Sequence, residues 1–299
     1  MLARMKPFVA ISLVLALAVA GCREEPMEVE VTDGGAHQKE IEQWQTRRAE
    51  RLKTEDSWLT LIGLFWLNDG NNVITLPKKD TPPIRLVRAG EAVTLEPAPA
   101  MTIEGKPVAG QVTLQNDTAQ TGPTIVQMGS VRFNVIKRGD RLGLRVKDAE
   151  ADTRTHFEGL DYYPIDPKYR VEARFEAYHP PKQIPIDDVT GMRSVNISPG
   201  ALVFTLEGKE YRIDPVLEEG SDELFLIFRD ATSRDETYQA GRYLYAPMPK
   251  DGKTVIDFNK AYNPPCAFTP YATCPLPPPQ NRVPIRIEAG EKRYAGAHA

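Results

Sequence analysis

Two polar segments near the C-terminus contain side chains that could bind or transform a ligand. The first runs from residue 229 to 244, directly after an apolar stretch, and the second runs from residue 257 to 282. A guanidinium binds a carboxylate or phosphate through paired hydrogen bonds, a desolvated carboxylate can act as a general base, and Tyr and Asn side chains can orient a polar ligand. The residues that we select for ligand binding are Arg229, Asp230, Tyr238, Arg242, Asp257, Asn259, Tyr262 and Asn263.

Each of these residues also has a purely structural interpretation. Arg and Asp side chains can pair with one another to hold loops, and Asn259 and Asn263 can satisfy the backbone groups of a loop. A cleft that joins Arg242, Asp257 and Tyr262 would favour binding or catalysis, whereas a flat apolar patch near Trp58 or Trp66 would favour a protein partner.

Three functions therefore stay open at this point. The protein could bind a small polar or anionic ligand, it could be a hydrolase-like enzyme with Asp230 or Asp257 as the base, or it could be an envelope scaffold. The sequence contains no G-x-S-x-G, H-E-x-x-H, P-loop or G-x-G-x-x-G signature, so no particular reaction is indicated. No catalytic residue, no metal and no cofactor are predicted.

The second polar segment is rich in proline. Seven prolines between Asp257 and Arg282 exclude a helix interior or a central strand there, and a long ordered loop inside a domain is often functional. The run YQAGRYLYAP, followed by DFNKAYNPPCAFTPYATCPLPPPQNRVPIRIEAGEK, resembles the bacterial and archaeal family called domain of unknown function 1684 (DUF1684). The resemblance extends from the region of Trp44 to Lys292 and implies one continuous unit, but it supplies no activity.

The N-terminus has the pattern of a lipoprotein signal peptide. Arg4 and Lys6 precede an apolar run that is too short to span a bilayer, and the segment ends in Val19-Ala20-Gly21-Cys22. These small residues before Cys22 resemble the bacterial lipobox, which predicts cleavage of residues 1–21 and lipidation of Cys22; the alternative is an ordinary signal peptide. We therefore expect an envelope protein that is anchored by lipid. The residue after Cys22 is Arg23 and not the Asp that favours retention in the inner membrane, so we expect the outer membrane rather than the inner one.

Lipidation of Cys22 leaves two cysteines, Cys266 and Cys274. An even number of cysteines in an oxidising compartment predicts a disulfide, and Pro270 between them favours the necessary turn. Zinc is disfavoured because no histidine lies near them. Two free thiols are the alternative.

Composition and length give the broad class. The chain has 299 residues, of which 41% are hydrophobic, and Lys+Arg (37) nearly balance Asp+Glu (41), so nothing supports nucleic-acid binding. Length predicts two parts after the signal peptide (1–21) and an acidic tether (22–36). These are a helix with a β-sandwich part (37–151) and a C-terminal β part with the Pro-rich loop (152–299).

Hydrophobic periodicity predicts a mostly β fold with one short N-terminal helix. Residues 37–53 have helical spacing, and short apolar segments recur after it in the rhythm of a β-sandwich or barrel. The first β part loosely resembles forkhead-associated sandwiches, without their phosphothreonine-reading residues. Predicted strands lie at 84–87, 92–95, 111–114, 131–136, 142–146, 171–177, 201–206, 210–213, 223–228, 254–258 and 283–287.

Overall fold

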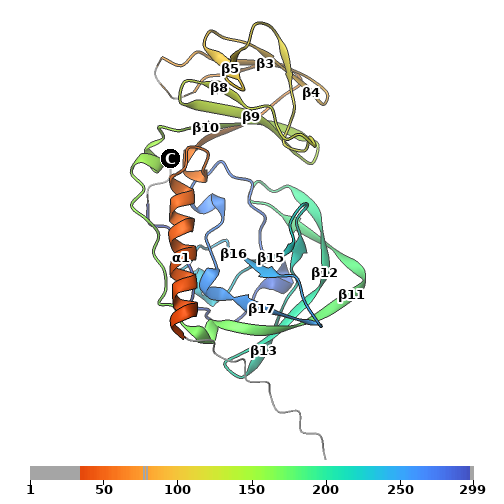
Figure 1. Cartoon of the computed structure of the whole chain (residues 1–299). Helices are drawn as coiled ribbons and strands as arrows, with labels where there is room; N and C mark the ends of the chain where they lie inside the picture. Colours follow the sequence, from red (N-terminus) through yellow and green to blue (C-terminus); the bar gives the residue numbers. More distant parts are fainter. Residues whose placement is uncertain (1–33, 77, 79, 297–299) are drawn as a thin grey trace, which may run out of the picture. The chain divides into compact units, whose positions relative to one another are not determined.

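The computed structural model describes residues 34–76, 78 and 80–296 (Figure 1). The predicted signal peptide, Cys22 and most of the predicted tether lie outside these residues. The described part of the chain falls within one compact unit, 31–299. Helix α1 spans Gly34–Lys53, so it begins before the predicted start at His37 and includes the end of the predicted tether. None of the helices in the described ranges is long and apolar enough to cross a membrane.

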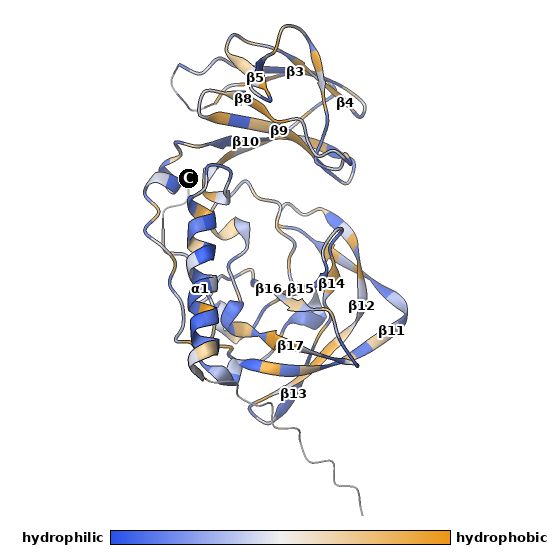
Figure 2. Ribbon diagram, viewed as in Figure 1, coloured by the Kyte–Doolittle hydropathy of each residue, from blue (hydrophilic) through white to orange (hydrophobic). Residues whose placement is uncertain are grey.

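Polar contacts fix α1 in place as much as apolar ones do. Figure 2 shows that α1 is predominantly hydrophilic, and its buried apolar side chains include Ile41 and Leu52. In addition, His37 Nε2 lies 2.7 Å from Asp257 Oδ2, and Arg48 Nε donates to Glu291 Oε1 at 2.9 Å. Asp257 and Glu291 belong to the C-terminal β part. These contacts therefore join α1 to residues that are far from it in the sequence.

The first β part contains two antiparallel sheets that share one core. The sheet orders are β1-β10-β9-β8-β5-β6 and β2-β3-β4-β7. Side chains such as Phe133 from the first sheet and Leu86 from the second belong to one buried cluster, as expected for two packed sheets. The strands are β1 (Leu61–Trp66), β2 (Gly70–Ile74), β3 (Ile84–Ala89), β4 (Ala92–Glu96), β5 (Met101–Ile103), β6 (Lys106–Pro107), β7 (Val112–Leu114), β8 (Val126–Met128), β9 (Val131–Arg138) and β10 (Arg141–Asp148).

The second β part follows the short helix α2 (Asp152–Thr155) and also contains two antiparallel sheets. Their orders are β13-β12-β11-β17 and β14-β15-β16. Phe204 and Leu226 are among the residues of the core that these sheets share. The strands are β11 (Arg170–Asp187), β12 (Arg193–Leu206), β13 (Lys209–Ile213), β14 (Val216–Leu217), β15 (Glu223–Phe228), β16 (Arg242–Pro247) and β17 (Lys253–Asp257).

The mostly β prediction is confirmed, with one strand placed wrongly. Residues 283–287 do not form a strand. Val283 N–H donates to the Arg229 carbonyl and Ile287 N–H donates to the Asp230 carboxylate, while Pro284 has no N–H to donate. The apolar side chains of this segment are buried, but its backbone is bonded to loops instead of a neighbouring strand.

Candidate ligand-binding cavity

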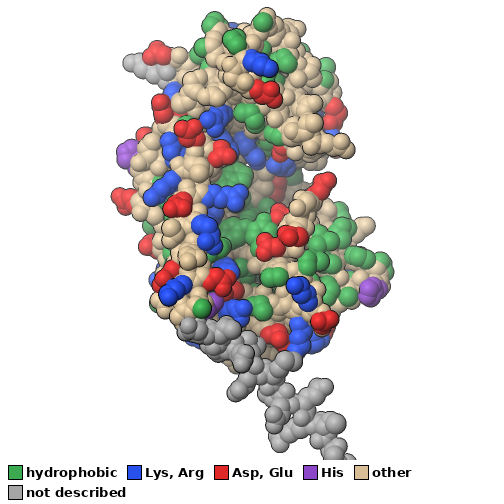
Figure 3. Space-filling view, in the orientation of Figure 1, with side chains coloured by type: hydrophobic (Ala, Val, Ile, Leu, Met, Phe, Trp, Pro, Cys, Tyr) green, Lys and Arg blue, Asp and Glu red, His purple; other side chains and the backbone are tan. Residues whose placement is uncertain are grey.

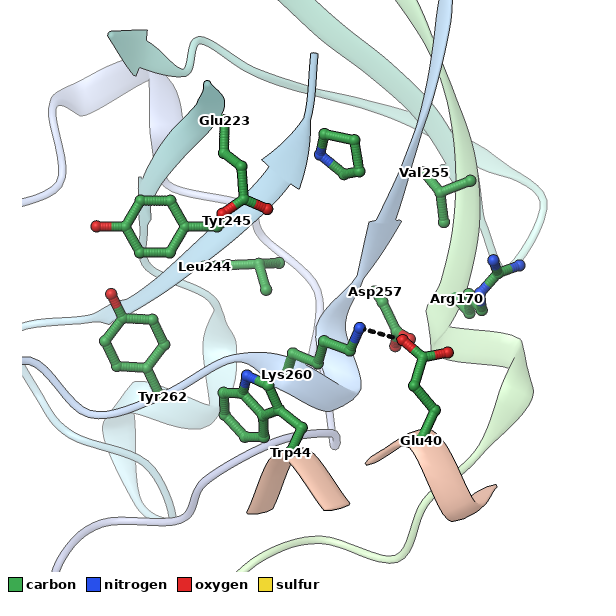
Figure 4. Close-up of a pocket in the computed structure, with 11 residues that line it drawn as sticks. Glu40, Trp44, Arg170, Glu223, Leu244, Tyr245, Val255, Asp257, Lys260 and Tyr262 are labelled. Carbon is green, nitrogen blue, oxygen red and sulfur yellow. Dashed lines mark hydrogen bonds and ion pairs between the residues drawn. The ribbon is translucent and has the colours of Figure 1, made fainter. Parts of the chain in front are cut away.

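A cavity of about 360 Å³ lies where α1, β16 and β17 approach one another (Figure 4). Its position follows from the end of β17, since Asp257 is the last residue of that edge strand and the Pro-rich segment begins there. The lining residues come from five separate stretches of the chain. They are Glu40, Trp44, Arg170, Glu223, Leu244, Tyr245, Pro247, Val255, Asp257, Lys260 and Tyr262.

Three aromatic rings form one side of the cavity, and Figure 4 shows them across from Asp257 and Glu40. The rings of Tyr245 and Tyr262 are nearly parallel with centroids 6.3 Å apart, and the centroid of Trp44 is 6.5 Å from that of Tyr262. Burial raises the pKa of both tyrosine hydroxyls above the usual value, so both are protonated at neutral pH. The Tyr245 hydroxyl donates to Glu218 at 2.6 Å.

Two of the carboxylates in the cavity are already engaged. Lys260 pairs with Glu40, and this hydrogen bond is the main reason that the pKa of Glu40 lies below its usual value. Asp257 Oδ2 contacts His37, and Asp257 Oδ1 accepts from the backbone and side-chain nitrogens of Asn259 at 3.1 and 2.9 Å. The cavity is therefore built on fixed charges that hold α1 and the β part together.

Two charged side chains at the cavity are free. Glu223 is exposed, Arg170 is half-buried, and neither side chain has a hydrogen bond or ion pair within the described part of the chain. A free carboxylate accepts hydrogen bonds and a free guanidinium donates them. The cavity can therefore offer a ligand both kinds of polar contact beside aromatic surface.

The structure divides the sequence-predicted residues into two groups. Asp257 and Tyr262 line the cavity, whereas Arg242 does not. Arg242 is completely buried, and its guanidinium donates to Asp230 Oδ1 at 3.1 Å, to the Ile287 carbonyl at 2.9 Å and to the Ala289 carbonyl. The expected cleft joining Arg242 with Asp257 and Tyr262 is therefore not what the fold builds, because Arg242 is used to hold the C-terminal segment.

The other predicted residues do not line the cavity and have structural partners instead. Asn259 bonds the backbone of Asp166, and Asn263 donates to Glu291 at 3.0 Å. The Tyr238 hydroxyl donates to the Cys266 carbonyl, and the Arg229 backbone pairs with the segment around Asn281. These contacts are the loop-holding roles that the structural interpretation of the sequence described.

Sequence reasoning missed most of the cavity. Tyr245 had a weak signal, since it lies in the run YQAGRYLYAP and directly follows the polar segment 229–244. Glu40 and Trp44 were assigned only to a packing helix, and nothing in the local sequence around Arg170 or Glu223 marks a site. These residues come together only through the pairing of distant strands.

The two cysteines of the Pro-rich segment are free thiols in contact with each other. The Cys266 N–H donates to Cys274 Sγ at 3.0 Å. A hydrogen bond from the Cys274 thiol is the largest cause of a pKa below the usual value for Cys266, whereas burial raises the pKa of Cys274 strongly. The disulfide is not formed in this structure and stays a prediction.

Residues 155–292 match the family described as protein of unknown function (DUF1684). The match covers less than half of the chain, so the chain is similar to this family over residues 155–292. The match ends at Lys292, as the resemblance predicted, but it begins at Thr155 and not near Trp44. The DUF1684 region therefore contains Arg170, Glu223, Asp257 and most other cavity residues, but α1 lies outside it.

Other comparisons add no activity. The solved solution structure of an uncharacterized protein from Haloarcula marismortui is 32% identical, over 46% of this chain and 78% of that one, with a TM-score of 0.40. A search of curated proteins found no match.

Proposed function

We propose that this protein is an envelope protein that binds a small polar ligand in the cavity beside α1. One observation carries the proposal: three aromatic rings, a free carboxylate and a free guanidinium meet at a cavity of about 360 Å³. Small-molecule sites have volumes of roughly 300–1,000 Å³, with apolar walls and a few convergent polar groups.

The charges of the cavity favour a neutral or zwitterionic ligand over a plain anion. Three carboxylates (Glu40, Glu223 and Asp257) stand against two cations (Arg170 and Lys260). Aromatic walls suit a ligand with an apolar face, and the free Glu223 and Arg170 suit a ligand that both donates and accepts hydrogen bonds. The anionic ligand allowed by the sequence is thus the less favoured one.

Binding is better supported than hydrolysis. Asp257 is engaged by His37 and Asn259, and Asp230 accepts hydrogen bonds from Thr232, Arg242 and the backbone of Ile287. A general base needs a lone pair within reach of the substrate proton. Neither of the two carboxylates that the sequence suggested as bases has an oxygen free of protein donors.

Fluorescence of Trp44 tests the cavity directly. In a Trp58→Phe, Trp66→Phe background Trp44 is the only tryptophan, and we would titrate methyl glucoside, glycine betaine and succinate as neutral, zwitterionic and anionic probes. We expect a saturable change with a neutral or zwitterionic probe and a weaker one, or none, with succinate. Tyr245→Ala and Glu223→Gln should each weaken the response about tenfold, the effect of one good polar or aromatic contact.

Glu219→Gln is the matched control, because Glu219 is an exposed carboxylate near Glu223 that does not line the cavity. If Glu219→Gln weakens binding as much as Glu223→Gln, or if no probe changes the fluorescence, the cavity is not the binding site.

We further propose that lipid on Cys22 anchors the protein, with the body facing the periplasm from the outer membrane. The sequence Val19-Ala20-Gly21-Cys22 supports this anchor. Cys22→Ser should abolish lipid labelling and release the protein from membranes in cell fractionation. A Cys22→Ser protein that stays in the membrane fraction after salt and carbonate washes would contradict the anchor.

A further inference from the structure

One face of the β9–β10 hairpin is strongly basic. Side chains alternate along a strand, and in β10 the set Leu142, Leu144 and Val146 enters the buried core. The opposite positions of the two strands carry basic side chains, and Figure 3 shows Lys and Arg gathered beneath these strands. The basic residues on this face are Arg132, Arg138, Arg141, Arg145 and Lys147.

Most of these cations already have a partner. Arg132 donates to Glu55 at 2.9 Å, and Arg138 donates to Asp117 at 2.7 Å. Lys147 donates to the backbone carbonyl of Asp56, and Arg141 is exposed and lies over the ring of Trp66. Arg132 and Arg138 are thus paired with carboxylates, whereas the partner of Lys147 is a neutral carbonyl.

Arg145 is different, because it is half-buried and no carboxylate of the described residues lies within ion-pair distance of it. Its guanidinium carbon lies 5.4 Å from the ring centroid of Trp58, and its Nε is buried without an acceptor. The guanidinium forms no hydrogen bond or ion pair with any residue that the structure describes. The charged groups that act on it are Arg138 and Lys147, which are also positive, and the Asp117 carboxylate, which is paired with Arg138.

An anion would supply the acceptor and the opposite charge that this arrangement lacks. Burial, with a contribution from Arg138, lowers the pKa of Arg145 to about 10, so the side chain remains charged at neutral pH. Buried polar groups are normally hydrogen-bonded, and an unpaired buried charge is expensive. Two cations close together beside an indole ring offer a ready site for a negatively charged group.

We propose that Arg145 is the centre of a second binding site, which takes an oxyanion, a phosphate or carboxylate group, beside Trp58 and Lys147. A guanidinium binds such groups through two parallel hydrogen bonds, and Lys147 adds a second positive charge. This site uses no residue that lines the cavity beside α1. It therefore does not depend on the proposed function.

Isothermal titration calorimetry of the purified full-length protein tests this site, with inorganic phosphate in one arm and succinate in the other. We expect saturable binding in at least one arm, and the tighter arm distinguishes a phosphate from a carboxylate ligand. Arg145→Gln should weaken the binding of the anion about tenfold, the loss expected for a charge-assisted hydrogen bond. Arg145→Lys should restore it only in part, because an ammonium keeps the charge but loses the planar fork.

Arg132→Gln is the matched control, since it removes one charge from the same face while Arg132 has its own partner in Glu55. Equal losses in Arg132→Gln and Arg145→Gln, or no saturable binding of either probe, would overturn the site. Phosphate or succinate should also raise the melting temperature of the wild type but not that of Arg145→Gln. If Arg145→Gln fails to fold, the partial loss of binding in Arg145→Lys is the test of the site. Tyr245→Ala should leave anion binding unchanged, so the two proposals can fail separately.

Discussion

Arg242 and Asp230 form an ion pair that is closed to solvent: Nη2 lies 3.1 Å from Oδ1, and the two side chains are 0% and 1% exposed. Asp230 lies two residues after the end of β15 and Arg242 begins β16, so the pair joins the two ends of the connecting loop. The same guanidinium donates to the carbonyls of Ile287 and Ala289, and the Asp230 carboxylate accepts from Ile287 N–H. The pair thereby fixes the C-terminal segment against the sheet.

Replacement of Arg242 should therefore affect folding before it affects binding. Arg242→Ala leaves the buried Asp230 carboxylate without its counter-ion and the carbonyls of Ile287 and Ala289 without the guanidinium donor, so we expect a loss of about 3–5 kcal/mol in the free energy of unfolding, measured by urea denaturation. Arg234→Ala, an exposed arginine in the same loop, should change it by less than about 0.5 kcal/mol. Unchanged stability together with weaker ligand binding would assign Arg242 to the site after all.

Gly241 should not tolerate a side chain. Its φ is +108°, and a Cβ there would lie 2.5 Å from the Phe228 carbonyl oxygen and 2.6 Å from Pro277 Cγ. Gly241→Ala combines backbone strain with a clash, so a destabilisation of about 2–4 kcal/mol is expected in thermal or urea unfolding. Gly252→Ala is the control, because Gly252 has φ +75° but open space around it, and it should cost about 1 kcal/mol.

Asp148 should make stability depend on acid pH. Burial acts to raise its pKa, but hydrogen bonds from Lys78 at 2.7 Å and Ser130 at 2.6 Å outweigh burial and hold the pKa below the usual value. Because the pKa of Asp148 is lower in the folded state than in the unfolded state, its carboxylate stabilises the fold at a pH above the unfolded-state pKa of about 3.9. This stabilisation is lost as the pH falls through the folded-state pKa.

Asp148→Asn should thus lower the free energy of unfolding by about 1–3 kcal/mol at neutral pH. The difference from the wild type should shrink as the pH falls below about 4. Asp140→Asn, at an exposed position, should show no such trend. A difference between Asp148→Asn and the wild type that stays constant down to the lowest pH would disprove the linkage.

The thiol pair gives a chemical test of the Pro-rich segment. In protein isolated from the envelope we expect a Cys266–Cys274 disulfide, so neither residue should react with an alkylating reagent after denaturation without reductant. In the reduced, folded protein Cys266 should be alkylated first, because its pKa is lowered while burial raises that of Cys274. Peptide mass spectrometry distinguishes the sites, and two fully reactive thiols before reduction would exclude the disulfide.

Local sequence patterns were sufficient for much of the framework. The apolar run at 224–228 predicted a strand, and β15 is Glu223–Phe228. This run can be continuous because β15 contributes Leu226 to one buried cluster and Phe225 to another, so both of its faces are covered. The strand predicted at 254–258 is β17 (Lys253–Asp257), which lies at the edge of its sheet.

The same patterns failed where the partner of a segment is distant. The alternation at 283–287 reports burial, but burial alone does not show whether the backbone pairs with a strand or with loop groups. The arginines give a second example. Arg242 was selected from the sequence as a site residue, but the arginine that lines the cavity is Arg170. Arg242 meets a buried carboxylate, whereas Arg170, at the start of β11, lies opposite Asp257 in the pairing with β17.

The sequence by itself determined the mostly β class, the positions of most strands, the N-terminal helix and the similarity of residues 155–292 to DUF1684, because these depend on spacing within short stretches and on one long motif. Only the tertiary structure decided which charged groups are satisfied and which are free. Glu40, Arg170, Glu223 and Tyr262 are brought to one cavity by the docking of α1 and by the pairing of β15–β16 and β11–β17. Such convergence depends on long-range contacts, and no local periodicity encodes them.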